Sequence, residues 1–314
     1  MAASAHSVVC THDEAKRVVD ELVKNIQENL KRVTGITPAE VIKGGSLGQG
    51  TAIPGDFDLD LVIYTDSISE LDIRLSGYSM RRWTDLLDTF LQQTLGRKYQ
   101  PQGKTDCAVQ FIYNDKIGVD LLISPNWRSL REFYTFLLGT PAVDRMKFSV
   151  CTARWQAHFF QHYVNDEAKE LIRRAKAWRN EIWDERPASG GKPKSYFLSL
   201  LVFYAYKMAK RQWPGVGFRD IAIRTADVLK QLVMSHETMD IVWDGVLDNV
   251  FYRRSEYPGL NCSRPRMMDP INPHNNLRMS GLGPVREGNY GPGDGKWSWI
   301  VANIGSLDLT TSLD

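Results

Sequence analysis

The stretch GGSLGQGTAIPGDFDLDLVIYT, residues 44–65, joins a glycine-rich turn to an apolar segment that carries two aspartates. The alternation over residues 58–65 predicts a strand, in which Asp58 and Asp60 share one face while Leu59 and Leu61 point to a core. Neighbouring carboxylates repel each other and are costly to bury unless a cation compensates them. Because these ligands are oxygens, Mg²⁺ or Mn²⁺ is the expected cation. An acidic strand edge without a metal is the alternative, since Asp-x-Asp alone is a weak signal.

A third carboxylate, Asp120, occurs in the segment GVDLLIS, which reads as another strand. Three acids on adjacent strands are what a two-metal phosphoryl-transfer site requires. The turn from Gly44 through Gly45 to Ser46 supplies backbone N–H groups and a hydroxyl that can approach a polyphosphate. The turn is not a P-loop, because no Gly-Lys-Ser/Thr follows it. The combined pattern is typical of the polymerase-β-like nucleotidyltransferases.

The bulk composition describes an ordinary globular chain of 314 residues, with 43% hydrophobic and 24% charged residues. A net charge of +2 permits an anionic substrate without requiring one. The four cysteines are scattered, and neither a secretory signal nor a membrane-length apolar run is visible. We therefore expect an intracellular, cytoplasmic protein with no membrane association, and the sequence implies no protein partner.

The periodicity of the chain predicts two parts. Helices are expected over residues 12–33 and 79–95, and 107–124 is expected to form a hairpin that turns at 114–118. From residue 148 the pattern becomes helical and is expected to continue through 220–252, followed by a loop-rich tail from 258. We expect an α+β fold with a mixed, mainly antiparallel lobe over residues 1–150 and a helical lobe over 151–314.

Four further segments make the pattern more specific: VIKGGSLGQGTAIPGDFDLDLVIY, LIRRAKAW, YFLSLLVFYAYK and SRPRMMDPINPHNNL. Together with the closing DGKWSWIVAN, they resemble the animal 2′-5′-oligoadenylate synthetases, in order and over nearly the whole chain. The resemblance implies a bilobed polymerase-β-like fold whose helical lobe completes the nucleotide site. It also implies transfer between a donor and an acceptor ATP.

The resemblance assigns roles to the residues that match the family motifs. Two Mg²⁺ ions are implied at Asp58, Asp60 and Asp120, which are the implied catalytic residues, and donor ATP is implied at Gly45 and Ser46. On the segment RRAK, Arg173 and Lys176 match the family's nucleotide contacts, and their spacing places them on one helix face. Tyr196 matches an aromatic that stacks on a base, with a core position as the alternative. Ser195 stands where the family commonly has Gln, as in the related cyclic GMP-AMP synthases, so base selectivity stays open.

Activation by double-stranded RNA is also implied by the resemblance, but several family cations are replaced in this chain. Gln49 stands where the family often has Lys, and Ala157 and Gln161 align with positions that carry Arg and Lys. Each missing cation removes a phosphate contact and the associated counterion release. We expect RNA dependence to be weak, absent or moved to another patch, for which the candidates are Lys16, Lys24, Lys31 and Lys43.

The function expected from these features is Mg²⁺-dependent synthesis of 2′-5′-oligoadenylates with release of pyrophosphate, in an innate-immune sensor enzyme. The alternatives are a cyclic or mixed-base dinucleotide synthase of the same superfamily and an inert RNA-binding scaffold. The scaffold ranks last because all three carboxylates are kept. His158 and His162 have metal-ligand spacing, but without a cysteine pair they are interpreted as packing or surface residues.

Overall fold

A computed structural model describes residues 12–53, 58–141, 144–187, 192–244, 246–247, 251–253, 265–280 and 294–312. The chain divides into two compact units, Met1–His158 and Phe159–Asp314. Among the described residues, no helix is both long enough and apolar enough to cross a membrane.

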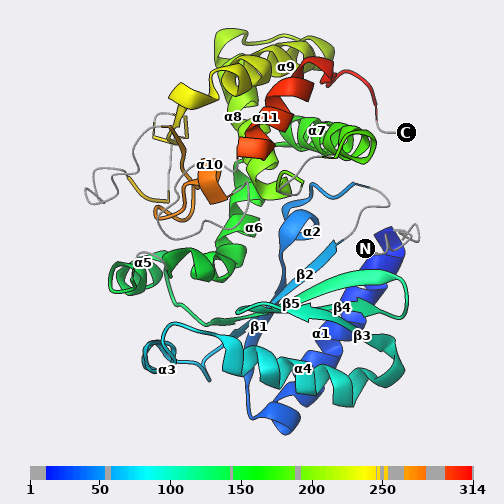
Figure 1. Ribbon diagram of the computed structural model, residues 1–314, viewed down its shortest axis with the longest axis vertical. Helices are drawn as coiled ribbons and strands as arrows, with labels where there is room; N and C mark the ends of the chain where they lie inside the picture. The colour runs from blue at the N-terminus through cyan, green and yellow to red at the C-terminus, as the bar shows by residue number, and fades with distance from the viewer. Residues whose placement is uncertain are drawn as a thin grey trace. The chain divides into compact units, whose positions relative to one another are not determined.

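The first unit is built on a five-stranded sheet with the order β1-β2-β5-β4-β3 (Figure 1). Strands β2 and β5 pair in parallel, and every other neighbouring pair is antiparallel. The strands are β1 (Pro38–Lys43), β2 (Asp58–Thr65), β3 (Tyr99–Lys104), β4 (Ala108–Tyr113) and β5 (Ile117–Pro125). The parallel pair at the centre of the sheet aligns β2 and β5 residue by residue.

The hairpin between β4 and β5 turns through Asn114 and Asp115, whose φ angles are +53° and +59°. Asn and Asp are the residues other than glycine that tolerate this left-handed region best, and two such residues in succession suit a tight hairpin. This turn fixes the register of β4 against β5, in which Gln110 pairs with Asp120.

One face of the sheet is covered by α1 (His12–Thr34) and α4 (Arg81–Leu95), which lie side by side in Figure 1. Apolar side chains at helical spacing, such as Leu22, Ile26 and Leu30, are buried beneath α1. A hydrogen bond of 2.9 Å from Asn25 to Thr94 joins the two helices. The helices therefore cover the sheet face opposite to the aspartates, as the strand alternation requires.

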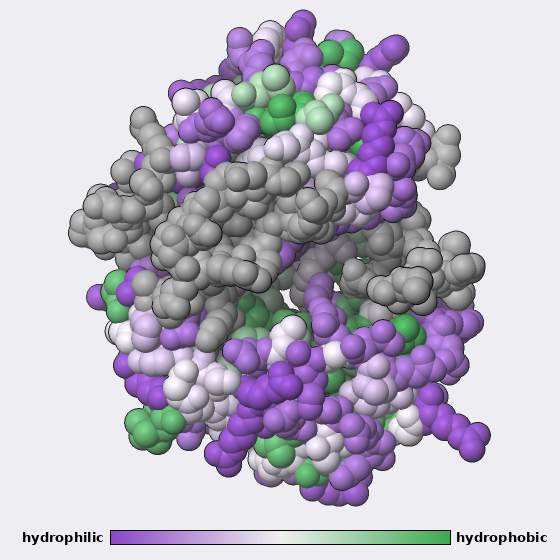
Figure 2. Space-filling model, viewed as in Figure 1, coloured by the Kyte–Doolittle hydropathy of each residue, from purple (hydrophilic) through white to green (hydrophobic). Residues whose placement is uncertain are grey.

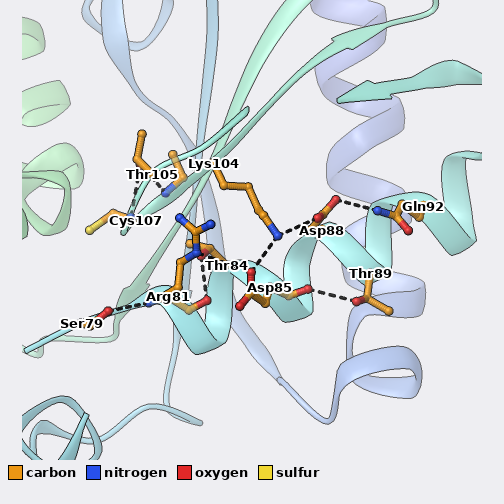
Figure 3. A network of polar contacts seen from close by, with 11 residues as sticks. Ser79, Arg81, Thr84, Asp85, Asp88, Thr89, Gln92, Lys104, Thr105 and Cys107 are labelled. Carbon is orange, nitrogen blue, oxygen red and sulfur yellow. Dashed lines mark hydrogen bonds and ion pairs between the residues drawn. The ribbon is translucent and has the colours of Figure 1, made fainter. Parts of the chain in front are cut away.

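A polar network fastens α4 to the edge strand β3 (Figure 3). Lys104 on β3 lies 2.8 Å from Asp85 and 3.0 Å from Asp88 on α4. Asp88 also accepts a hydrogen bond from Tyr99, and together these donors lower its pKa although burial acts in the opposite direction. On the face drawn in Figure 2, apolar residues appear in small scattered groups among hydrophilic ones, as on an ordinary protein surface.

The first unit also contains α2 (Gly45–Gln49), α3 (Glu70–Leu75), α5 (Leu130–Leu138) and the 3₁₀ segments Gly96–Lys98 and Arg145–Thr152. At the far end of the aspartate face, Val62 and Tyr64 pack with Ala153. The Tyr64 hydroxyl donates to the carbonyl of Cys151 and accepts from the N–H of Arg154, each at 3.1 Å. This closes the core at that end of the sheet.

The second unit is helical, and its centre is α8 (Ser195–Gln212), which packs between α7 (Asp166–Glu185) and α9 (Phe218–Met234) (Figure 1). Nearly every position from Phe197 to Phe203 is buried, which explains why this helix is apolar around most of its circumference. The unit also contains β6 (Asp240–Ile241), β7 (Arg266–Met267), α10 (Leu277–Ser280) and α11 (Asp294–Asn303). Helix α6 (Ala153–His162) begins in the first unit and ends in the second.

Most elements expected from the sequence are confirmed, including the α+β class with a mainly antiparallel sheet and the strand over 58–65. The helix expected within 220–252 is confirmed in part, because α9 covers the first half of this range and ends at Met234, after which the chain forms β6. Strand β6 pairs in parallel with β7, and Arg266 forms an ion pair with Asp240 across the pair. The expected loop-rich tail contains α11, whose Trp297 is buried at 1% exposure. Both β6 and α11 contact segments that are distant in sequence.

Candidate active site

Two of the three expected carboxylates lie opposite each other on the central parallel strands. Asp60 on β2 is in direct register with Asp120 on β5, and Asp58 pairs with Gly118. Residues in register on adjacent strands share a face, so Asp60 and Asp120 project together, away from the buried Leu59 and Val119. Like charges directly opposite each other repel, which is the condition that a divalent cation relieves.

The backbone of Asp58 lies in β2, whereas its side chain is outside the described part of the structure. Within the described residues, no three His, Cys, Asp or Glu side chains gather as a metal site. Asp60 and Asp120 nevertheless supply two carboxylates on one face. This donor set, which contains only oxygens, fits Mg²⁺ or Mn²⁺.

The glycine turn packs directly against Asp60. The Gly44 N–H donates to the Asp60 carbonyl at 2.7 Å, and Gly45 has a φ of +52° at the start of α2. A Cβ on Gly45 would lie 1.7 Å from Asp60 Oδ2, and one on Gly48 would lie 2.1 Å from the Lys43 carbonyl. Gly45 therefore lets the turn approach the Asp60 carboxylate, and Gly48 lets α2 approach the backbone of β1. Ser46 follows Gly45 on α2.

Gln110 is a site neighbour that the sequence analysis did not identify. It pairs with Asp120 across β4 and β5, and its Nε2 donates to both carboxylate oxygens at 3.2 Å. A donor of this kind holds the carboxylate in one orientation. The signal was present in the hairpin, because the turn at 114–115 fixes which residue of β4 faces Asp120.

The expected phosphate contacts Arg173 and Lys176 lie on α7 in the second unit. Arg173 donates to Glu170 through Nε and Nη2, at 3.1 and 2.8 Å, and its side chain is 29% exposed. Burial opposes the ionisation of Glu170, but hydrogen bonds from Arg174 and Arg173 bring its pKa below the ordinary value. Lys176 is buried at 2% exposure. The two cations therefore differ in solvent exposure, although their helical spacing predicted that they share one face of the helix.

Ser195 and Tyr196 open α8, and both make specific contacts inside the second unit. The buried Arg179 donates from Nη1 to Ser195 Oγ and to the Pro193 carbonyl, each at 2.9 Å. The Tyr196 hydroxyl donates to Asp269 Oδ1 at 3.0 Å, and its half-buried ring lies 6.3 Å from that of Phe160. Tyr196 therefore has a packing role whether or not it also stacks on a base.

Asp269 explains why the segment DPINPHNN forms a compact turn. Its carboxylate accepts from the N–H groups of Ile271 and Asn272, at 2.8 and 3.2 Å, and from the Asn275 amide at 3.1 Å. Complete burial raises the pKa of Asp269 to about 6, although these donors and Tyr196 act in the opposite direction. The sequence marked this segment as a family motif but gave no role to its aspartate.

The buried Asp269 makes a pH-dependent contribution to stability. Because its folded pKa of about 6 lies above the ordinary 3.8, its stabilising effect is complete below pH 3.8 and is lost as the pH rises through 6. The difference between the folded and ordinary pKa values corresponds to roughly 3 kcal/mol in the free energy of unfolding. We expect the stability advantage of the wild type over Asp269→Asn to shrink between pH 4 and 7, as measured by urea unfolding. A difference that stays constant with pH would contradict this assignment.

The residues considered for RNA dependence have contrasting environments. Gln49 is buried at 5% exposure, so the position where the family often has Lys does not present a side chain to solvent here. Gln161 on α6 is exposed, as are His158 and His162. On α1, Lys16, Lys24 and Lys31 are exposed, and Lys24 lies 3.9 Å from Glu28.

Comparison with known proteins gives consistent similarities. Residues 130–282 match the model described as 2′-5′-oligoadenylate synthetase 1, domain 2, C-terminus. The 2′-5′-oligoadenylate synthase 2 of Rattus norvegicus is 25% identical over 281 residues, which cover 82% of this chain and 36% of the relative. The human synthase 2 is 24% identical, with coverage of 92% and 41%. The synthase 1A of Rattus norvegicus is 25% identical, with coverage of 84% and 79%. The chain thus spans less than half the length of these two synthase 2 relatives.

Solved structures show the same fold at lower identity. The CdnC component of an Escherichia coli MS115-1 CdnC:HORMA-deltaN complex superposes with a TM-score of 0.54 at 18% identity, covering 93% of this chain and 81% of that one. The Bradyrhizobium diazoefficiens CD-NTase CdnG, solved in complex with GTP, gives 0.54 at 13% identity, with coverage of 98% and 89%. The fold is therefore that of the polymerase-β-like nucleotidyltransferases.

Proposed function

We propose that this chain, which is similar to the 2′-5′-oligoadenylate synthetases, joins ATP molecules through 2′-5′ bonds and releases pyrophosphate. The family resemblance read from the sequence is thereby confirmed, while the activity is our proposal. The main observation in support of this activity is that Asp60 and Asp120 lie in register on adjacent strands, beside the glycine turn. Carboxylates and a close-packed turn on one sheet face suit phosphoryl transfer to a nucleotide.

The proposed reaction is an in-line displacement at the α-phosphorus of the donor ATP. The 2′-hydroxyl oxygen of the acceptor forms a bond to this phosphorus while the bond to the β-phosphate oxygen breaks, and pyrophosphate leaves. Asp58, Asp60 and Asp120 would hold two Mg²⁺ ions, which supply positive charge to the phosphate oxygens and lower the pKa of the attacking hydroxyl. We assign the role of proton acceptor to Asp120, whose carboxylate accepts hydrogen bonds from Gln110.

Other residues are proposed to bind the nucleotides. Ser46, in the turn beside Asp60, would contact the donor phosphates. On α7, Arg173 would serve as the phosphate contact, since its side chain is partly exposed whereas Lys176 is buried within the helix packing. Tyr196 would present its ring to a base while its hydroxyl stays bonded to Asp269.

We expect little dependence on double-stranded RNA. Gln49 is buried, and Ala157 and Gln161 are neutral where the family carries cations, so this surface offers fewer phosphate contacts. The lysines of α1 are the remaining candidates for an RNA surface, although Lys24 is adjacent to Glu28.

The proposal is tested by incubating nuclease-treated protein with ATP and Mg²⁺, with and without long double-stranded RNA. Products are digested with a nuclease that cleaves only 3′-5′ bonds and are then analysed by mass spectrometry. We expect resistant linear oligoadenylates in both conditions. Product that is fully degraded by the nuclease would contradict the 2′-5′ linkage, and product that forms only with RNA would contradict the expected independence.

A cyclic or mixed-base dinucleotide synthase is the second candidate, and it rests on Ser195. The family commonly has Gln at this position, but here a serine hydroxyl accepts from the buried Arg179. A shorter side chain in this place changes which groups meet the base. Turnover that appears only when GTP or other nucleotides are added to ATP would favour this second candidate.

A further inference from the structure

A pocket of about 400 Å³ lies entirely within the second unit, between the end of α6, the start of α7 and the second half of α8. Its volume is in the range of small-molecule sites. None of the residues assigned above to catalysis or nucleotide binding lines it. It is formed by aromatic and apolar side chains together with three cations, and its lining includes Tyr163, Asn165, Phe203, Tyr206, Lys207, Lys210 and Arg211.

Helix α8 presents these groups in order along one face. Phe203, Tyr206, Lys207, Lys210 and Arg211 follow the spacing i, i+3, i+4, i+7, i+8, which is a single helical stripe. The aromatic residues come first, and the cations occupy the last two turns. One end of the pocket is therefore suited to a flat apolar ring and the other to an anion.

The aromatic end is rigid. The Tyr206 hydroxyl accepts from the Asn165 amide at 2.9 Å and donates to Glu167 at 2.8 Å, so its ring cannot rotate freely. Burial raises the pKa of Tyr206 to about 12, so the hydroxyl stays neutral. Tyr163 stacks on Phe159 with ring centres 5.5 Å apart, its ring centre lies 5.9 Å from that of the tilted Phe251, and it remains half-buried. Because these contacts already hold the aromatic rings in place, a base that stacks on them causes little further loss of side-chain conformational entropy.

Within the part of the chain that the structure describes, the cationic end of the pocket carries more positive charge than neighbouring carboxylates balance. Lys210 lies 2.9 Å from Glu167, which compensates one of the three cations. Among the described residues, Lys207 and Arg211 have no ion-pair partner, and they lie four residues apart, where like charges repel. The helix dipole explains basic residues in the last turn of α8, but Lys207 lies before that turn. An anion bound here would relieve the repulsion between Lys207 and Arg211.

From this arrangement we infer that the pocket is a second nucleotide site, which binds the base of a nucleoside phosphate at Tyr163 and its phosphates at Lys207 and Arg211. The inference requires neither the proposed catalysis nor a metal ion. It concerns binding alone, so it stands or fails separately from the proposed function.

The test measures the binding of ATP and of tripolyphosphate to the full chain by titration calorimetry in EDTA, where metal-dependent binding at the aspartates is suppressed. Lys207→Gln with Arg211→Gln is expected to weaken ATP binding by about tenfold or more. The matched control is Arg219→Gln with Lys230→Gln, which removes two cations from α9 outside the pocket and is expected to leave the affinity unchanged. Equal affinities in the two double variants would overturn the inference.

The aromatic end is tested separately. Tyr163→Leu is expected to weaken ATP binding but not tripolyphosphate binding, while Tyr163→Phe keeps the affinity for both, and melting temperatures verify that each variant is folded. Labelling with 8-azido-ATP is expected to modify the peptide that contains Tyr163. Label found only on other peptides, or tripolyphosphate binding as tight as ATP binding, would overturn the assignment of a nucleotide.

Discussion

Replacing Asp60 by Asn is expected to lower the rate of nucleotide joining by roughly 10³-fold or more, because the loss of a metal-binding carboxylate removes several kcal/mol of transition-state stabilisation. Asp58→Ala, Asp60→Ala and Asp120→Ala are each expected to abolish turnover with the fold intact. Asp60 faces Asp120 in register, so the variant also loses a like-charge repulsion. In EDTA, Asp60→Asn should therefore be at least as stable to urea as the wild type.

The matched control for this experiment is Asp115→Asn in the hairpin turn of the same sheet. Asp115 has a φ of +59°, a conformation that Asn also adopts readily, and it lies in the turn before β5, five residues before Asp120 and outside the strand positions that carry the site. This variant should keep both its activity and its stability. Retained activity in all of the Asp58, Asp60 and Asp120 variants would contradict the site assignment.

Replacing Gly45 by Ala is expected to have the second largest effect, a loss of activity of about 100-fold. An alanine Cβ would lie 1.7 Å from Asp60 Oδ2, so the carboxylate or the turn must move. Small displacements of a reacting group can cost about 10²-fold in rate. The φ of +52° adds a backbone strain of about 1–2 kcal/mol to the free energy of folding.

Gly35→Ala separates these two effects. Gly35 has a φ of +77°, but nothing lies within 4 Å of the position where its Cβ would be built. It should lose a similar amount of stability and keep its activity. Rates and urea unfolding measured on both variants test this expectation, and equal activity losses in the two would show that strain, not the contact with Asp60, is responsible.

The sequence was sufficient to predict the parts of this fold that depend on local periodicity. The alternation around Asp58 and Asp60 identified β2, and the turn chemistry at Asn114 identified the β4–β5 hairpin. What the alternation could not supply was register. The pairing of Asp60 with Asp120 requires β2 and β5 to lie in parallel, and residues between them in sequence do not specify that alignment.

The parts that sequence reasoning missed share one physical feature, since each is decided by contacts between distant segments. Strand β6 exists because Asp240 and Ile241 pair with Arg266 and Met267, and a window around 240 does not contain those partners. The role of Asp269 depends on a hydroxyl from α8, and that of Gly45 on a carboxylate from the next strand. Helical spacing predicted that Arg173 and Lys176 share a face, but it did not predict that one is partly exposed and the other buried.

The proposed nucleotidyl transfer is tested most directly by measuring the release of pyrophosphate from ATP by the purified full chain in the presence of Mg²⁺. Pyrophosphate is quantified by an enzyme-coupled assay, and inorganic phosphate is measured in parallel. Nucleotidyl transfer predicts that the amount of pyrophosphate released equals the number of new internucleotide bonds. Neither product should form with the Asp60→Asn variant or in EDTA. Release of inorganic phosphate alone, or no turnover with any mixture of the four nucleoside triphosphates, would contradict it.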